Sequence, residues 1–226
     1  EKSINFKQLD KSSSILNRVI GDGTSYINGK ITSNGQVIIT NENGVVFGKD
    51  AIIDVGSLIA TSANLSNQNF LDSEFVFEQK SRKSKIQNFG HILTDDHGHV
   101  VLISPEIVNE GYIVAKKGNV FLAGGKSVEL KFDGNEKLNG IHVEPGDWQT
   151  LIENKKVIEV GEGQVILSAS GYNELKGGLV RNSGQLSATS AIQVGGRIIL
   201  VGEEIELAST SLIDTSGDLG GGDILI

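Results

Sequence analysis

Asp95, Asp96, His97 and His99 form the one cluster in the sequence whose residue types could bind a metal ion. In a strand followed by a turn, Asp95, His97 and His99 could point to one side. Adjacent turn residues rarely supply three well-directed ligands, however, and the sequence offers no partner to orient the imidazoles. Asp and His also suit a turn without a metal. We therefore expect ordinary turn residues here, with no metal site and no cofactor.

Paired carboxylates are the second candidate chemistry, because two acidic side chains on one exposed face can act as acid and base or bind calcium. The available pairs, Asp95–Asp96 and Glu203–Glu204, lie far apart and have no Arg or Lys at matching offsets. Trp148 could stack on a sugar ring, although a lone Trp in a charged loop more often anchors that loop. We predict no catalytic residues.

Gly217–Asp223 resembles a calcium-binding glycine repeat but occurs once, so we expect a turn there.

Composition excludes several further classes of function. The formal net charge is −8 and the pI is near 5.0, which argues against sequence-independent binding to nucleic acid or to an anionic membrane. The basic cluster from Lys80 to Lys85 is short and reads as a solvated loop. The chain has no Cys, hence no disulfide and no thiol nucleophile. No apolar run approaches the roughly 20 residues that a membrane-spanning helix needs.

The elements that position these residues follow from a repeat. The 226 residues include 29 glycines and only 2 prolines, which indicates regularly spaced turns in one elongated domain. A pattern of Asn-x-Gly followed by aliphatic residues recurs at an offset of about 20 residues. It begins at Asn88, Asn109 and, more loosely, Asn182. This period is too short for a propeller blade or a helical repeat, so we predict an all-β fold, a parallel β-helix.

In such a coil, inward side chains of successive turns stack in columns. We expect these columns to pair Ile92 with Ile113, Val100 with Val120 and Leu102 with Leu122. Two stretches interrupt the rhythm, at about residues 64–87 and 131–160, and we expect both to be excursions outside the coil. The first should add a strand or hairpin on a flank, and the second should be a loop or hairpin that Trp148 anchors.

The stretch from Asn41 to Asp50 reads as a turn between two strands, because β-branched residues precede and follow it. Asn and Gly tolerate positive φ, and Asn side chains bind nearby backbone groups. Such a corner can be stacked many times.

Six short motifs occur in order between Ile4 and Leu65. They are Leu16-Asn17-Arg18-Val19, Ile27-Asn28-Gly29-Lys30-Ile31, Asn34-Gly35-Gln36-Val37, Asn41-Glu42-Asn43-Gly44-Val45, Phe47-Gly48-Lys49 and Ala60-Thr61-Ser62. Together they resemble the N-terminal secretion domain of two-partner-secreted exoproteins, the family of filamentous haemagglutinin and the high-molecular-weight adhesins. Glu42 stands where that family usually has proline.

The resemblance implies a right-handed parallel β-helix with extra-helical strands. It implies secretion to the cell surface or medium through the periplasm of a Gram-negative bacterium. The partner is then an outer-membrane transporter that recognises Asn41–Val45, with Leu16–Val19 as the upstream family motif. We expect residues 1–226 to form one such domain, the front part of a much longer exoprotein.

That exoprotein is expected to be an adhesin or haemagglutinin, which would reach host cells through its downstream region. The family's domain also has strands before the position of Ile4 that this sequence lacks. Two alternatives stay open: a carbohydrate-active enzyme, since some polysaccharide lyases and hydrolases are β-helices, and a stand-alone receptor-binding module.

Overall fold

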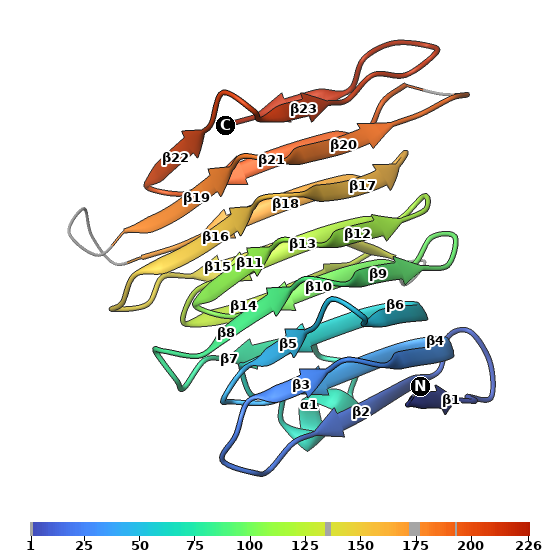
Figure 1. The fold of residues 1–226 in the computed structure, drawn as a ribbon, viewed down its shortest axis with the longest axis vertical. Coiled ribbons are helices and arrows are strands. Elements are labelled where there is room, and N and C mark those ends of the chain that lie inside the picture. The colour runs from blue at the N-terminus through green and yellow to red at the C-terminus, as the bar shows by residue number, and fades with distance from the viewer. Residues whose placement is uncertain (1, 134–136, 172–176, 193) are drawn as a thin grey trace.

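The computed structural model describes residues 2–133, 137–171, 177–192 and 194–226. Apart from one short helix, α1 (Asn67–Leu71), its regular elements are strands (Figure 1). They are β1 (Ser3–Phe6), β2 (Ser14–Arg18), β3 (Ser25–Ile27), β4 (Lys30–Thr40), β5 (Val45–Phe47), β6 (Ile52–Thr61), β7 (Val76–Glu78), β8 (Lys85–Asn88), β9 (His91–Thr94), β10 (His99–Ile103), β11 (Glu106–Asn109), β12 (Tyr112–Ala115), β13 (Asn119–Gly124), β14 (Ser127–Phe132), β15 (Leu138–Glu144), β16 (Thr150–Asn154), β17 (Val157–Gly161), β18 (Gln164–Ala169), β19 (Gly178–Asn182), β20 (Gln185–Thr189), β21 (Arg197–Val201), β22 (Glu204–Leu207), β23 (Leu212–Asp214) and β24 (Asp223–Leu225).

The strands wind into a coil whose successive turns lie one above another (Figure 1). Strands β8, β9 and β10 form one turn of the coil, and β11, β12 and β13 form the next, each strand pairing in parallel with its counterpart. One sheet, here called sheet B, forms one face of the coil in the order β22-β19-β16-β11-β8-β5-β3. A larger sheet, here called sheet A, forms the other faces in the order β23-β20-β17-β12-β9-β6-β10-β13-β18-β21-β24, with β4 paired to β6, β1 and β2. Its two faces meet at the long strands β4 and β6. The predicted parallel β-helix is confirmed.

The interior holds the expected aliphatic columns. Ile92 pairs with Ile113, Val100 with Val120 and Leu102 with Leu122, and all six side chains are fully buried in one cluster. Because side chains alternate between the two faces of a strand, every second residue of each coil turn contributes to this core. These column predictions are confirmed.

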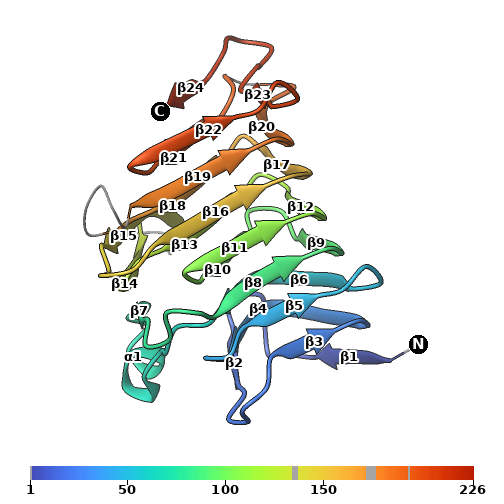
Figure 2. The same ribbon diagram turned by 60° about the vertical axis from the view of Figure 1, so that its left-hand side comes forward.

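Outside the coil, a second hydrophobic cluster lies between sheet A and a small antiparallel sheet of order β15-β14-β7. Phe77 of β7 and Phe121 of β13 are both fully buried there. Figure 2 shows β7, α1, β14 and β15 together on one flank of the stack. The two interruptions of the repeat, which are far apart in the sequence, thus combine into one extra-helical layer.

The predicted bounds of these excursions need correction. The hairpin β14–β15 starts at Ser127, not at residue 131, and residues 150–154 and 157–161 pair in parallel with β11 and β12 inside the stack. Residues 85–87 also belong to the coil, as part of β8. The charged side chains of β16 and β17 point outward and made the segment look like a loop, while Ile152 and Ile158 fill the core.

The stretch Asn41–Asp50 also differs from its prediction as a single turn. Residues 45–47 form strand β5, which pairs with Ser25–Ile27 and with β8. Three buried residues are enough for a strand here because both neighbouring turns of the coil supply backbone partners. The stretch is therefore a turn, a short strand and a second turn.

Candidate functional site

The two family motifs meet at one corner of the first coil turns. Strand β2 lies parallel to the second half of β4, in a register that places Arg18 beside Thr40. The residue after β2 continues this pairing, since Val19 N donates to the O of Thr40, the last residue of β4, over 2.9 Å. The segment that follows β2 therefore passes directly beside the turn that begins at Asn41.

Asn41 connects that turn to this segment. Its side chain is almost completely buried, with 1% exposed. Its Nδ2 donates to Gly23 O over 2.9 Å and to Ser25 Oγ over 2.8 Å, while its Oδ1 accepts from Asn43 N over 2.9 Å. Each polar atom of the Asn41 amide is thus satisfied by backbone or side chains of the corner, as burial requires.

Asn43 and Gly44 complete the turn. Asn43 Nδ2 donates to Gly21 O over 2.9 Å, and Gly44 N donates to Asn41 O over 2.8 Å, which closes a β-turn. Gly44 alone in this turn has positive φ, at 100°, and a Cβ at this position would lie 2.4 Å from Lys85 O. The asparagines therefore act through their side chains, and glycine supplies the unusual backbone conformation.

Arg18 ties the same corner to the start of the first excursion. Its guanidinium donates to Asn64 Oδ1 over 2.8 Å, to Leu65 O over 2.6 Å and to Asn67 Oδ1 over 3.0 Å. A planar guanidinium with several donors suits three acceptors that diverge from one point. Arg18 thereby connects β2 with the start of α1 and the residues just before it.

The other motif residues pack against neighbouring side chains or bind the backbone. Leu16 packs against the outer hydrophobic cluster, Val45 is fully buried in the coil interior, and Asn17 Nδ2 donates weakly to Ile38 O over 3.4 Å. Val19 is 40% exposed. These residues fix the corner rather than present chemistry.

Glu42, which occupies the family's proline position, is the second residue of the β-turn. Its side chain is half exposed and lies 3.4 Å from Lys80 Nζ. Within the described residues, its backbone N–H has no acceptor and its φ is not positive. Proline is favoured at the second position of a β-turn and has no N–H to donate, so the absence of an acceptor for the Glu42 N–H fits a position that proline occupies in the family.

The sequence analysis missed the partners of the motif asparagines. Gly21, Gly23 and Ser25 accept their hydrogen bonds, although nothing in their types marks them as binding residues. The glycines near position 22 signalled only a turn. Their carbonyls could not be assigned from spacing, because the parallel register of β2 and β4 brings them into place.

The candidate metal cluster does not converge. His97 is exposed with φ 67°, and its Nδ1 lies 3.2 Å from Lys117 O, whereas His99 is buried next to Phe132. Burial lowers the pKa of His99 to about 4. In the part of the chain that the structure describes, no three His, Cys, Asp or Glu side chains are grouped to hold a metal ion.

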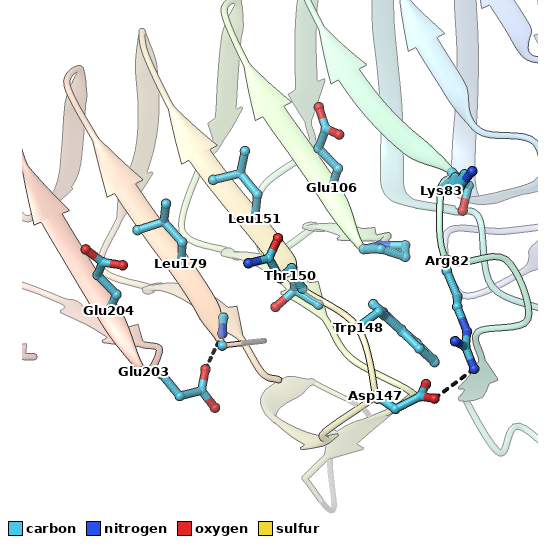
Figure 3. A pocket seen from close by; sticks show the side chains of 15 residues that line it. Arg82, Lys83, Glu106, Asp147, Trp148, Thr150, Leu151, Leu179, Glu203 and Glu204 are labelled. Carbon is cyan, nitrogen blue, oxygen red and sulfur yellow. Dashed lines mark hydrogen bonds and ion pairs between the residues drawn. The ribbon is translucent and has the colours of Figure 1, made fainter. Parts of the chain in front are cut away.

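Trp148 lies in the wall of an open groove of about 1030 Å³ between the hairpin base and sheet B (Figure 3). The Arg82 guanidinium lies 5.6 Å from the centre of the indole and pairs with Asp147 over 2.8 Å. A Cβ on Gly146 would lie 2.7 Å from the indole ring, so Gly146 packs closely against it. Trp148 therefore has close protein neighbours, consistent with an anchoring role for this loop.

The acidic pair in this groove is divided. Figure 3 shows Glu204 on the strand and Glu203 directed toward the neighbouring loop. Glu203 accepts from Gly171 N over 3.3 Å and from Gly178 N.

No helix in the described residues has the length and hydropathy to cross a membrane.

Comparison with known proteins identifies the family. The model of the TPS secretion domain matches residues 1–218. A heme/hemopexin-binding protein of Haemophilus influenzae strain KW20 / Rd is 32% identical over 219 residues, covering 93% of this chain and 24% of the relative. A second Haemophilus influenzae heme/hemopexin-binding protein is 29% identical over 234 residues, covering 94% and 25%.

The fold agrees with a solved structure. The crystal structure of the HMW1 secretion domain from Haemophilus influenzae matches with a TM-score of 0.78 and 27% identity, over 99% of this chain and 65% of that one. The chain spans about a quarter of the length of the two curated relatives. Proteins with this domain are secreted through the periplasm of Gram-negative bacteria to the cell surface or medium. The chain belongs to the TPS secretion domain family of two-partner-secreted exoproteins.

Proposed function

We propose that the corner formed by Leu16–Val19, Asn41–Val45 and the loop between β2 and β3 is the element that the outer-membrane partner transporter reads during export. The observation that carries this proposal is convergence. Asn41 and Asn43 bind the segment between the two motifs, and Arg18 binds the start of the first excursion, so side chains of both motifs hold one corner together. The folded domain then serves as the scaffold on which the rest of the exoprotein forms.

Burial of Asn41 supports recognition before folding. Its side chain is 1% exposed, so a transporter that contacts its amide must meet the chain before the corner closes. The same amide groups that would bind the transporter can afterwards bind Gly23 O and Ser25 Oγ. Release from the transporter and closure of the corner would then use the same donors.

Export assays with the transporter co-expressed test this proposal. Asn41→Ala and Asn43→Ala are expected to reduce the amount of exoprotein in the medium, singly and more strongly together. The matched control is Asn109→Ala, which removes another buried asparagine from the coil but lies outside both motifs. Its loss of thermal stability is compared with that of the motif variants.

Two results would contradict the proposal. Normal export of the double variant would show that Asn41 and Asn43 only shape the fold. Equal export loss in Asn109→Ala, at an equal fall in melting temperature, would show that stability and not recognition limits export.

Substitutions of Arg18 distinguish a transporter that reads charge from one that needs the assembled corner. Arg18→Lys keeps the charge but cannot bind Asn64, Leu65 and Asn67 in one plane. If the transporter reads the charge of the chain before the corner closes, as we propose, this variant is exported normally, whereas a fall in export would show that the assembled corner is required. Arg18→Gln should be impaired in both cases.

The activity of the whole exoprotein is a separate proposal. We infer an adhesin or haemagglutinin from the motif resemblance, whereas the names of the two curated relatives favour binding of heme or hemopexin. Full-length exoprotein assayed for binding to hemin, to hemopexin and to epithelial cells distinguishes the two. The family is one of secretion domains, so catalysis is not our proposal for this region.

A further inference from the structure

Four buried asparagines stack inside the coil where sheet B turns into sheet A. Asn88, Asn109, Asn154 and Asn182 end strands β8, β11, β16 and β19 and are register partners along the stack. All four are fully buried. The Nδ2 atoms of Asn88, Asn109 and Asn154 each donate to the Oδ1 of the next asparagine over 2.8 Å, and Asn182 Nδ2 donates to Ser211 Oγ of the following turn. We call this set the asparagine ladder.

The ladder is directional. Nδ2 of Asn88, Asn109 and Asn154 also donates to a backbone carbonyl of the later coil turn, namely Tyr112, Val157 and Gln185 respectively. Asn109, Asn154 and Asn182 thus accept from the asparagine of the turn before, and Asn88, Asn109 and Asn154 donate to the turn after. Asn109 Nδ2 also donates to Gly111 O of its own turn over 3.2 Å, but its side-chain acceptor is present only when the next turn brings an oxygen to that position.

The number of residues between successive coil turns does not fix how one turn aligns with the next. Successive members of the ladder are 21, 45 and 28 residues apart, because the hairpin and other loops are inserted between them. The neighbouring column does not fix the alignment either, since Ile107, Ile152 and Val180 are all aliphatic. A slip of one residue would turn a strand inside out, but a slip of two keeps the same face inward.

The ladder distinguishes the native register from a slip of two. If β16 slipped against β11, Ile152 would face Asn109 in place of Asn154, and the Asn109 amide would lose its side-chain acceptor. Buried polar groups that must find one another can select one alignment among similar hydrophobic ones.

We propose that the asparagine ladder sets the register in which each new coil turn docks on the previous one. Aliphatic columns stabilise any aligned coil, and the ladder selects one alignment. The proposal concerns folding of the domain and does not depend on recognition by a transporter.

Engineered disulfides report register directly, because the chain has no Cys. Leu151 and Leu179 are native register partners on adjacent parallel strands, within the Cα separation that a disulfide spans. Leu151 and Arg181 are offset by two residues, which places their Cα atoms about 8 Å apart, too far to be bridged without a slip. The two pairs, L151C/L179C and L151C/R181C, are each refolded from denaturant, oxidised with diamide and quantified by mass spectrometry.

The pairs are compared in the parent and in a ladder-free variant, N88L/N109L/N154L/N182L, which removes the four side-chain amides together, so that no asparagine of the ladder is left facing an apolar register partner. With the ladder present, only L151C/L179C should form a disulfide. Without it, the slipped disulfide of L151C/R181C should increase at least about fivefold. The parent L151C/R181C controls for the ion pairs that Arg181 makes with Glu153 and Glu206.

A folded ladder-free variant that forms only the native disulfide would overturn the proposal. If that variant does not regain β-sheet circular dichroism, the same pairs are measured in the single variant Asn154→Leu, which interrupts the ladder at β16. A folded Asn154→Leu protein with no increase in slipped disulfide would equally overturn it.

Discussion

The amino-terminal corner and the asparagine ladder use the same residue type in opposite ways. Asn41 and Asn43 bind backbone carbonyls and a hydroxyl of an irregular loop, so their partners are unlike themselves and occur once. Asn88 and Asn109 bind asparagines like themselves, in a column that runs from β8 to β19. Burial of an asparagine side chain therefore does not by itself define the role of that side chain. A repeated partner makes a structural column, and a unique partner makes a site that can be distinguished from the rest of the chain.

The largest effect is expected when both regions lose the core that supports them. Leu122→Asp places an unpaired charge in a fully buried column, at a cost of several kcal/mol. We expect loss of the β-sheet signal in circular dichroism. A folded protein with parent-like melting would show that neither region depends on the aliphatic columns.

The ladder should be more sensitive than the corner to a single apolar substitution. Asn109→Leu removes the side-chain acceptor of Asn88 and the side-chain donor of Asn154 together. We expect the free energy of unfolding to fall by about 3 kcal/mol, since two buried groups lose partners. Urea denaturation measures this, and a loss below that of Asn43→Ala would reverse the ranking.

His99 provides a buried polar group that titrates, unlike the amides of either region. Its pKa falls from 6.5 to about 4 because burial disfavours the imidazolium. The unfolded chain therefore binds a proton at His99 between about pH 6.5 and 4 that the folded chain does not, so stability decreases as the pH falls through that window.

Melting temperatures measured between pH 7 and pH 4 check this sign. His99→Gln should flatten the dependence, and His97→Gln, at an exposed position just before β10, is the matched control for replacing a histidine. Hydrogen bonds lower the pKa values of the Asp10, Asp214 and Glu206 carboxyls in the folded chain. Their contribution to the free energy of unfolding is therefore lost only as the pH falls below the ordinary pKa of a carboxyl group. An unchanged slope in His99→Gln would contradict the prediction.

Substitutions in the corner should act locally. Asn43→Ala removes the bond to Gly21 O and should cost about 1 kcal/mol. Asn41→Ala removes two donors and should cost slightly more. Hydrogen exchange is expected to increase at Gly23 to Ile27 and to stay unchanged at β11 to β13, while a uniform increase across the coil would make the corner part of the same cooperative unit as the ladder.

The smallest effect is expected at Glu42. Glu42→Pro removes the half-exposed ion pair with Lys80, which contributes little, and presets φ at a turn position whose N–H has no acceptor in the described residues. We expect a change of less than about 1 kcal/mol, in the stabilising direction. Export should be intact or improved, and a loss of export would show that the transporter reads the glutamate.

The sequence alone determined the repeat, the parallel coil and its interior columns. Aliphatic residues returning about every 20 positions can be buried only if successive turns stack, so Ile92 and Ile113 had to meet. The motif residues were also recognisable, because Asn and Gly at a strand end define a turn whatever lies around it.

Only the tertiary structure decided what those residues bind. Asn41 reaches Gly23, and Arg18 reaches Asn67, because β2 pairs with β4 in one particular register. The two excursions join in one antiparallel sheet because each has an apolar face that must cover the outside of sheet A. The spacing of apolar residues along the sequence predicts which residues of a strand face the core. Register and long-range pairing depend instead on how much surface the whole coil buries, and this burial is present only in the folded chain.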